Sequence, residues 1–297
     1  MKSPVVQKKL KAAVILTFFI FCLEGVGGIL ANSLALISDA AHMLTDVVSL
    51  SLAWFALKIA ARPSTNDKTY GYHRMEIFAA FINGVLLALM ACGILYEAVL
   101  RILEPEAVQS KLVIIIALMG LVTNLGVIYF LKHPYTETQD LNVKSAFYHV
   151  IGDTLASIGV LLGACVMLVT GWYIVDAILA VVIGGLLIWG AKSIIAEATH
   201  ILLEGVPKGI SVTEVKQELK SIPDIKDIHE LHIWSICSNI YALSTHALVS
   251  DQKINQAESI LSEARERLET KFNITHSTIQ FESNPCHQAA ELCGIRH

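Results

Sequence analysis

The stretch "SDAAHMLTD", residues 38–46, places two aspartates and a histidine within a long apolar run. Ionisable side chains are costly inside a membrane-spanning segment, and those that are present generally serve a function. His42 and Asp46 are four residues apart, so they lie one turn apart on the same face of a helix. The same spacing recurs at His149 and Asp153 in a later apolar run. The sequence therefore predicts two membrane helices that each present a histidine and an aspartate.

Two imidazoles and two carboxylates that meet between helices form a tetrahedral nitrogen and oxygen site suited to zinc. Histidine ligands argue against magnesium or calcium. Asp39 precedes His42 by three residues and shares its face, as a partner that orients a ligand or accepts a proton. One such pair could equally be a histidine hydrogen-bonded to an aspartate between packed helices. Two pairs in separate spans favour a metal site.

The composition of the whole chain indicates a membrane protein. Of 297 residues, 54% are hydrophobic and 16% are charged, and the mean hydropathy is +0.59. A helix needs about 20 apolar residues to cross the hydrocarbon core of a bilayer. Six runs of this kind predict an α-helical bundle of six transmembrane helices, at 12–31, 34–60, 76–102, 112–131, 143–170 and 173–202.

The distribution of basic residues predicts the orientation. Lysines precede the first run, and further basic residues occupy the second and fourth connections, which lie on the same side if there are six spans. Short loops rich in lysine and arginine stay in the cytosol. Both termini are therefore predicted to be cytosolic. The first run is long enough to span and lacks a clear cleavage site, so we interpret it as a retained helix rather than a signal peptide.

The composition changes near Glu204, which divides the chain into a transmembrane domain, 1–203, and a soluble domain, 204–297. The second part holds 13 acidic and 9 basic residues, whereas the first holds 13 of each. An acidic domain of this kind does not bind nucleic acid through a basic surface.

Periodicity within the soluble part predicts a small α+β domain. Apolar residues recur at helical spacing in two segments and alternate as in strands in three others. The expected order is helix 211–222, strand 228–236, strand 241–249, helix 255–272 and strand 276–282. One sheet with helices on one face follows from this order.

Four motifs follow one another along the chain. They are "NSLALISDAAHMLTD" (32–46), "YGYHRMEIFAAFING" (70–84), "HVIGDTLASIGV" (149–160) and "LHIW" (231–234). Together they resemble the cation diffusion facilitator family, near its CzcD-like and animal zinc-transporter branch. The resemblance implies a homodimer in a bacterial inner (plasma) membrane with a ferredoxin-like cytosolic domain. It assigns the transport site to His42, Asp46, His149 and Asp153.

The resemblance also implies zinc ligands in the cytosolic part. It places them at His232, His246 and Glu282, on three predicted strands, with His276 as a weaker fourth candidate. His73 matches an interfacial ligand of the family, although a histidine that packs at a helix start or meets lipid headgroups is equally compatible. The tail adds Cys286 and Cys293, which either bind zinc or remain reduced thiols in a flexible end.

The expected activity is zinc export in exchange for protons by alternating access, without an organic cofactor. Zn²⁺ would be the cargo and also a structural or regulatory ion. His42 is associated with zinc preference in the family, and cadmium and cobalt remain possible cargoes. Two alternatives are a membrane metal sensor without flux and an intramembrane metalloenzyme. The second lacks support because the chain has no His-Glu-x-x-His motif.

Overall fold

The computed structural model describes residues 4–137, 141–237, 240–251 and 253–284. Within the helices, the side chains at 4–17, 46, 50, 53 and 130–149 are outside this description. Six long helices come first: α1 (Pro4–Ala31), α2 (Leu34–Ala60), α3 (Arg74–Leu103), α4 (Ser110–Glu137), α5 (Leu141–Thr170) and α6 (Ile174–Leu202). They are followed by α7 (Val212–Lys220), β1 (Ile225–Cys237), β2 (Ile240–Val249), α8 (Ile254–Phe272) and β3 (Ile274–Glu282).

The long helices confirm the predicted membrane domain. Five of them, α2 to α6, are long and apolar enough to cross a bilayer within the described residues. The apolar part of α1 that is described, Phe18–Ala31, is shorter. Many large apolar side chains on these helices are exposed, as expected where lipid rather than protein surrounds a helix.

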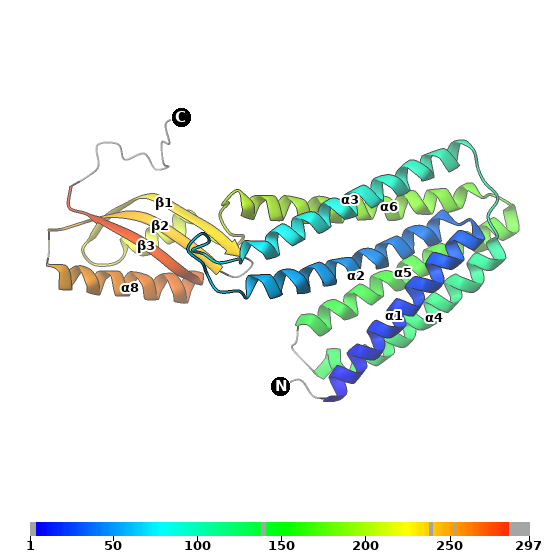
Figure 1. The fold of residues 1–297 in the computed structure, drawn as a ribbon, viewed down its shortest axis with the longest axis horizontal. Coiled ribbons are helices and arrows are strands. Elements are labelled where there is room, and N and C mark those ends of the chain that lie inside the picture. The colour runs from blue at the N-terminus through cyan, green and yellow to red at the C-terminus, as the bar shows by residue number, and fades with distance from the viewer. Residues whose placement is uncertain (1–3, 138–140, 238–239, 252, 285–297) are drawn as a thin grey trace. The chain divides into compact units, whose positions relative to one another are not determined.

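The chain folds into two compact units. The first contains residues 1–51 and 83–193, and the second contains 52–82 and 194–297. In the first unit, α4 lies along both α1 and α5 (Figure 1). Buried alanines such as Ala117 and Ala164 let these helices approach closely, as is common in membrane bundles.

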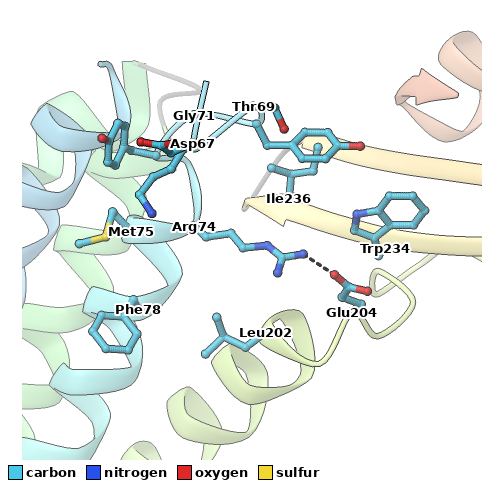
Figure 2. A pocket seen from close by; sticks show the side chains of 13 residues that line it. Asp67, Thr69, Gly71, Arg74, Met75, Phe78, Leu202, Glu204, Trp234 and Ile236 are labelled. Atoms are coloured by element: carbon cyan, nitrogen blue, oxygen red, sulfur yellow. Dashed lines mark hydrogen bonds and ion pairs between the residues drawn. The ribbon is translucent and has the colours of Figure 1, made fainter. Parts of the chain in front are cut away.

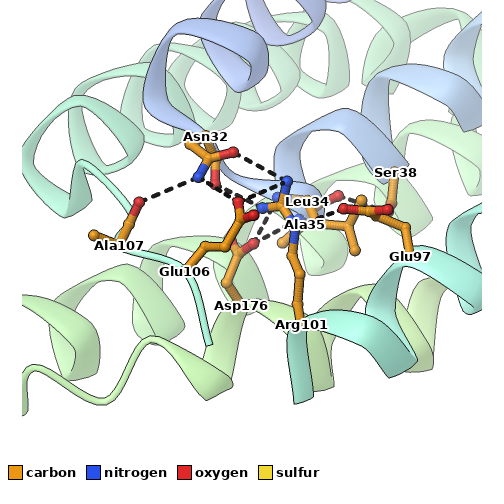
Figure 3. A network of polar contacts seen from close by, with 9 residues as sticks. All are labelled: Asn32, Leu34, Ala35, Ser38, Glu97, Arg101, Glu106, Ala107 and Asp176. Atoms are coloured by element: carbon orange, nitrogen blue, oxygen red, sulfur yellow. Dashed lines mark hydrogen bonds and ion pairs between the residues drawn. The ribbon is translucent and has the colours of Figure 1, made fainter. Parts of the chain in front are cut away.

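A polar network fixes the turn between α1 and α2 (Figure 3). Asp176, in the first turn of α6, accepts hydrogen bonds from the Ser33 hydroxyl and the Leu34 backbone N–H, both at 2.5 Å. These contacts cap the start of α2, where backbone N–H groups lack partners within the helix. Arg101 of α3 donates to the backbone carbonyl of Asn32 at 2.8 Å. The network therefore fixes where α2 begins, and α2 carries His42.

The second unit contains the predicted α+β domain. Its three strands form one sheet in the order β1-β2-β3, with β1 antiparallel to β2 and β3 parallel to β2. Helices α7 and α8 bury Val215, Leu219, Ala264 and Leu268 against the apolar face of this sheet. The opposite face of the sheet carries polar side chains, His246 and Glu282 among them, as the alternation of the strands predicts.

Candidate metal centres

The first candidate centre lies between α2 and α5. His42 Nε2 is 4.0 Å from Asp153 Oδ1, so the structure brings these two predicted ligands together. Asp39 and Asp153 are both buried, at 5% and 8% exposure. Asp46 and His149 belong to α2 and α5, but their side chains are outside the described residues. A cation between these helices would offset the cost of burying the carboxylates.

Glu24 of α1 is a buried carboxylate that the sequence analysis missed. Its residue is 1% exposed, and Oε2 has no hydrogen-bond partner among the described residues. Glu24 lies against α4, because a Cβ added at Gly120 would come within 2.6 Å of Glu24 Oε1. A buried polar atom without a partner requires an explanation. The signal available in the sequence was the single acidic residue within the first apolar run.

The second candidate centre lies on the polar face of the sheet. One ligand atom from each of His229, His246 and Glu282 lies within 4.8 Å of the others. His246 Nδ1 is 2.8 Å from Glu282 Oε1, and His229 Nε2 is 3.1 Å from Glu282 Oε2. The glutamate thus faces both imidazoles, and its Oε1 also accepts a hydrogen bond from Gln280.

His246 and Glu282 were predicted ligands, whereas His229 was not. The structure places His229 opposite His246, and His232 three residues further along β1, opposite Ser244. His232 is outside the group that meets within 4.8 Å among the described residues. The difference arises from a β-bulge, because three steps along β1 oppose two steps along β2.

Two imidazoles and one carboxylate suit zinc, which binds histidine nitrogen and carboxylate oxygen in tetrahedral sites. His229 is nearly buried, at 7% exposure, so its nitrogen is already removed from water. The rings of His229 and His246 meet edge to face, with their centroids 5.4 Å apart. This donor set therefore fits a divalent metal ion and leaves at least one coordination position open.

The remaining predicted ligands lie elsewhere. His73 and His276 line one cavity of about 340 Å³ in the second unit, together with Arg62 and Ile240. Cys286 and Cys293 fall outside the described residues.

A larger cavity of about 550 Å³ lies beside the first residues of α3 (Figure 2). Met75, Phe78 and Trp234 give it apolar walls. At its edge, Arg74 Nη2 is 2.8 Å from Glu204 Oε1. No group of metal ligands is found there among the described residues.

Comparisons with known proteins cover most of the chain. The model of the cation efflux transmembrane domain matches residues 10–203, and that of the cation efflux protein cytoplasmic domain matches 207–284. The metal cation efflux system protein CzcD of Cupriavidus metallidurans is 42% identical over 95% of this chain and 89% of its own length.

Two further relatives are similar over comparable lengths. A cadmium, cobalt and zinc/H(+)-K(+) antiporter of Bacillus subtilis is 40% identical over 91% of this chain and 88% of its own. The zinc transporter ZitB of Escherichia coli is 34% identical over 89% of this chain and 83% of its own length. The solved metal-bound C-terminal domain of CzcD is 37% identical and covers 25% of this chain and 99% of its own, with a TM-score of 0.23.

Proposed function

The chain belongs to the cation efflux family, and from that membership we propose that it exports zinc across a membrane in exchange for protons. It is a multi-pass membrane protein and not an enzyme. The observation that supports the proposed site is the approach of His42 to Asp153 across α2 and α5, beside a second buried aspartate. Cadmium and cobalt are proposed as additional cargoes.

The transport site would bind cargo through His42, Asp46, His149 and Asp153. These groups must lose their protons before they bind a metal ion, so protons and metal compete for the same ligands. Histidine side chains are suited to exchanging protons in the physiological pH range. If the helices expose the site to each side in turn, metal leaves outward and protons return inward. Asp39 would orient His42 from the preceding turn.

The second centre would hold a structural or regulatory zinc in the cytosol. We propose His229, His246 and Glu282 as its ligands, because the structure brings these three together. His232 remains a candidate on the same strand. His73, His276, Cys286 and Cys293 remain proposals for further ligands. Metal at this centre would bring the cytosolic parts of two protomers together and would adjust transport to cytosolic zinc.

The proposed arrangement includes a transmembrane domain at 1–203 and a cytosolic domain at 204–297. We propose that the protein lies in the inner (plasma) membrane as a homodimer, with both termini in the cytosol. The basic loops predicted from the sequence support this orientation.

Zinc flux in proteoliposomes tests the transport proposal. Purified protein is reconstituted, a pH gradient is imposed, and zinc entry is followed with an internal fluorescent chelator. We expect Asp153→Asn to abolish gradient-driven flux because it removes a ligand charge while preserving size. Asp251→Asn is the matched control, since Asp251 is exposed outside the helices, and it should retain flux. Undiminished flux in Asp153→Asn would contradict the site.

The same assay separates the transporter from a metal sensor. A sensor would bind zinc in detergent yet show no flux in either the wild type or the variants. The similarity to relatives named as transporters favours flux.

A further inference from the structure

We propose that Glu230 is a positioning residue of the second metal centre, which holds the His246 ring so that Nδ1 faces the metal. This inference rests on the proposed cytosolic site at His229, His246 and Glu282. Glu230 is absent from that group of ligands, and no role follows for it from the sequence motifs.

The two nitrogens of His246 face different carboxylates. Nδ1 is 2.8 Å from Glu282 Oε1, within the group that would bind the metal. Nε2 is 3.7 Å from Glu230 Oε2, on the other edge of the ring. A metal held between His246 and Glu282 therefore takes Nδ1, which leaves Nε2 to carry the proton. Glu230 is the carboxylate that Nε2–H then faces.

The backbone of β1 is strained at this residue. Glu230 has φ = +49°, in the left-handed region that residues other than glycine rarely adopt. In a regular strand His229 and Glu230 would point to opposite faces of the sheet. The bulge interrupts this alternation, as shown by Ile228 and Leu231, which both face the apolar core although they are three residues apart. His229 and Glu230 consequently share the polar face with His246.

A second contact holds the bulge in place. Thr245, 1% exposed, donates its hydroxyl to the carbonyl oxygen of His229 at 3.0 Å. The carbonyl of His229, which precedes the strained Glu230, thus has a hydrogen-bond partner although the pairing of β1 with β2 is irregular there. Strained backbone persists where the surrounding structure enforces it, and it is concentrated at functional sites. Here the strain places a carboxylate beside a metal-binding histidine.

The chemistry of metal-bound histidine explains why a carboxylate is useful there. A histidine that binds metal through one nitrogen usually donates its other N–H to a carboxylate or carbonyl, which fixes the ring and its tautomer. Loss of such a partner typically lowers metal affinity by about 10- to 100-fold. Glu282 accepts a hydrogen bond from Gln280 Nε2 at 3.1 Å. His246 and Glu282 would therefore each have a second side chain that orients them.

Zinc affinity of the full-length protein in detergent tests this role. The background carries His42→Ala and Asp153→Asn, so that zinc binding reports the second centre. Glu230→Gly is informative because glycine adopts φ = +49° without strain. We expect Glu230→Gly to bind zinc about 10- to 100-fold more weakly, while the metal-free protein unfolds at an unchanged or higher temperature. The cobalt absorption spectrum should also change, since it reports ligand geometry.

Two further variants complete the design. Glu230→Gln retains an oxygen acceptor and should lose less affinity than Glu230→Gly. Glu258→Gln, which changes an exposed glutamate of α8, is the matched control and should bind zinc like the background protein.

The outcomes distinguish this inference from the site on which it rests. If His246→Ala abolishes binding in the same background while Glu230→Gly binds zinc as before, the positioning role is wrong and the metal centre stands. If His246→Ala leaves binding unchanged, the metal centre itself is wrong, and the role of Glu230 is overturned with it. A purely structural role for Glu230 would lower the unfolding temperature of the metal-free Glu230→Gly variant and leave affinity and the cobalt spectrum unaltered.

Discussion

Among single residues, close packing around buried acidic side chains determines which substitutions the membrane helices tolerate. The Glu24 side chain packs against Gly120 of α4, where a larger residue would collide with it. Ser157 of α5 lies nearby. A side chain at that glycine would therefore displace the buried Glu24 side chain rather than lipid. Buried polar groups tolerate displacement poorly because few alternative partners exist within a membrane.

The substitution Gly120→Ala tests this packing. Its Cβ would lie 2.6 Å from Glu24 Oε1, so the carboxylate must move. We expect zinc flux to fall by about tenfold or more, since the same Cβ would contact Ser157, one helical turn after the proposed ligand Asp153. A displacement of about 1 Å near a reactive group can cost about 100-fold. The unfolding temperature in detergent should also fall, because overpacking typically costs about 1–3 kcal/mol.

Gly126→Ala on the same helix is the matched control. No described residue lies within 4 Å of a Cβ placed there, so flux and stability should stay near those of the wild type. Equal flux in both alanine variants would show that the position of Glu24 does not matter for transport.

Individual site residues differ in how well the sequence predicts them. His42 and Asp153 were predicted because helical spacing is local, and their helices bring them to 4.0 Å. His229 was missed because a bulge shifts the phase of β1, and alternation alone could not predict where the extra residue lies. Glu24 lacks a partner at helical spacing, so the sequence marks it only as a lone acidic residue in an apolar run, and its contact with α4 appears only in the structure.

Among the secondary-structure elements, the six apolar runs predicted the six long helices, but α1 begins at Pro4 rather than at residue 12 and α4 ends at Glu137 rather than at residue 131, because both helices continue past their apolar parts. Helix α2 has the predicted bounds, and α6 begins one residue later than expected. The start of α2 depends on Asp176 of a distant helix, which the sequence alone could not show. The sheet was predicted in its order of elements, whereas the parallel pairing of β2 with β3 depends on tertiary packing.

Helices α7 and α8 are joined by an ion-pair cluster that responds to pH. Glu218 accepts from Lys271 Nζ at 2.7 Å and from Arg267 Nη1 at 3.0 Å. The hydrogen bond from Lys271, followed by that from Arg267, holds the pKa of Glu218 below its usual value. A carboxylate with a lowered folded-state pKa stabilises the fold above its unfolded pKa of about 4.3. That stabilisation is lost as the pH falls through the folded-state value.

The variant Glu218→Gln should therefore unfold at a lower temperature than the wild type near pH 7, and the difference should shrink as the pH falls below about 4.3. Thermal unfolding of the full-length protein in detergent with a chelator measures this effect. Glu266→Gln, at an exposed position of α8, should show no such dependence. A difference in unfolding temperature that stays constant with pH would assign the loss to packing rather than to charge.

In the molecule as a whole, the proposed regulation of export would need the apolar helices to respond to the C-terminal domain. One described contact joins the start of α3 to the residues that follow α6: Arg74 bonded to Glu204 (Figure 2). Their side chains are 43% and 61% exposed, so the pair contributes little to stability, about 1 kcal/mol or less. The pair would instead act by position, because it holds the segment that leads into the C-terminal domain beside the start of α3.

Reversing the charges of Arg74 and Glu204 tests whether their ion pair matters for transport rather than for stability. Arg74→Glu places two carboxylates together and should reduce zinc flux several-fold, while the unfolding temperature changes little because the site is exposed. Adding Glu204→Arg restores opposite charges and should recover most of the flux. Raising the salt concentration should reduce the difference among the variants, since exposed charges are screened over about 8–10 Å at 0.1–0.15 M. If the double variant transports no better than Arg74→Glu, the arginine acts through its shape or through another partner. Recovery would instead mean that attraction between these two positions is what transport needs.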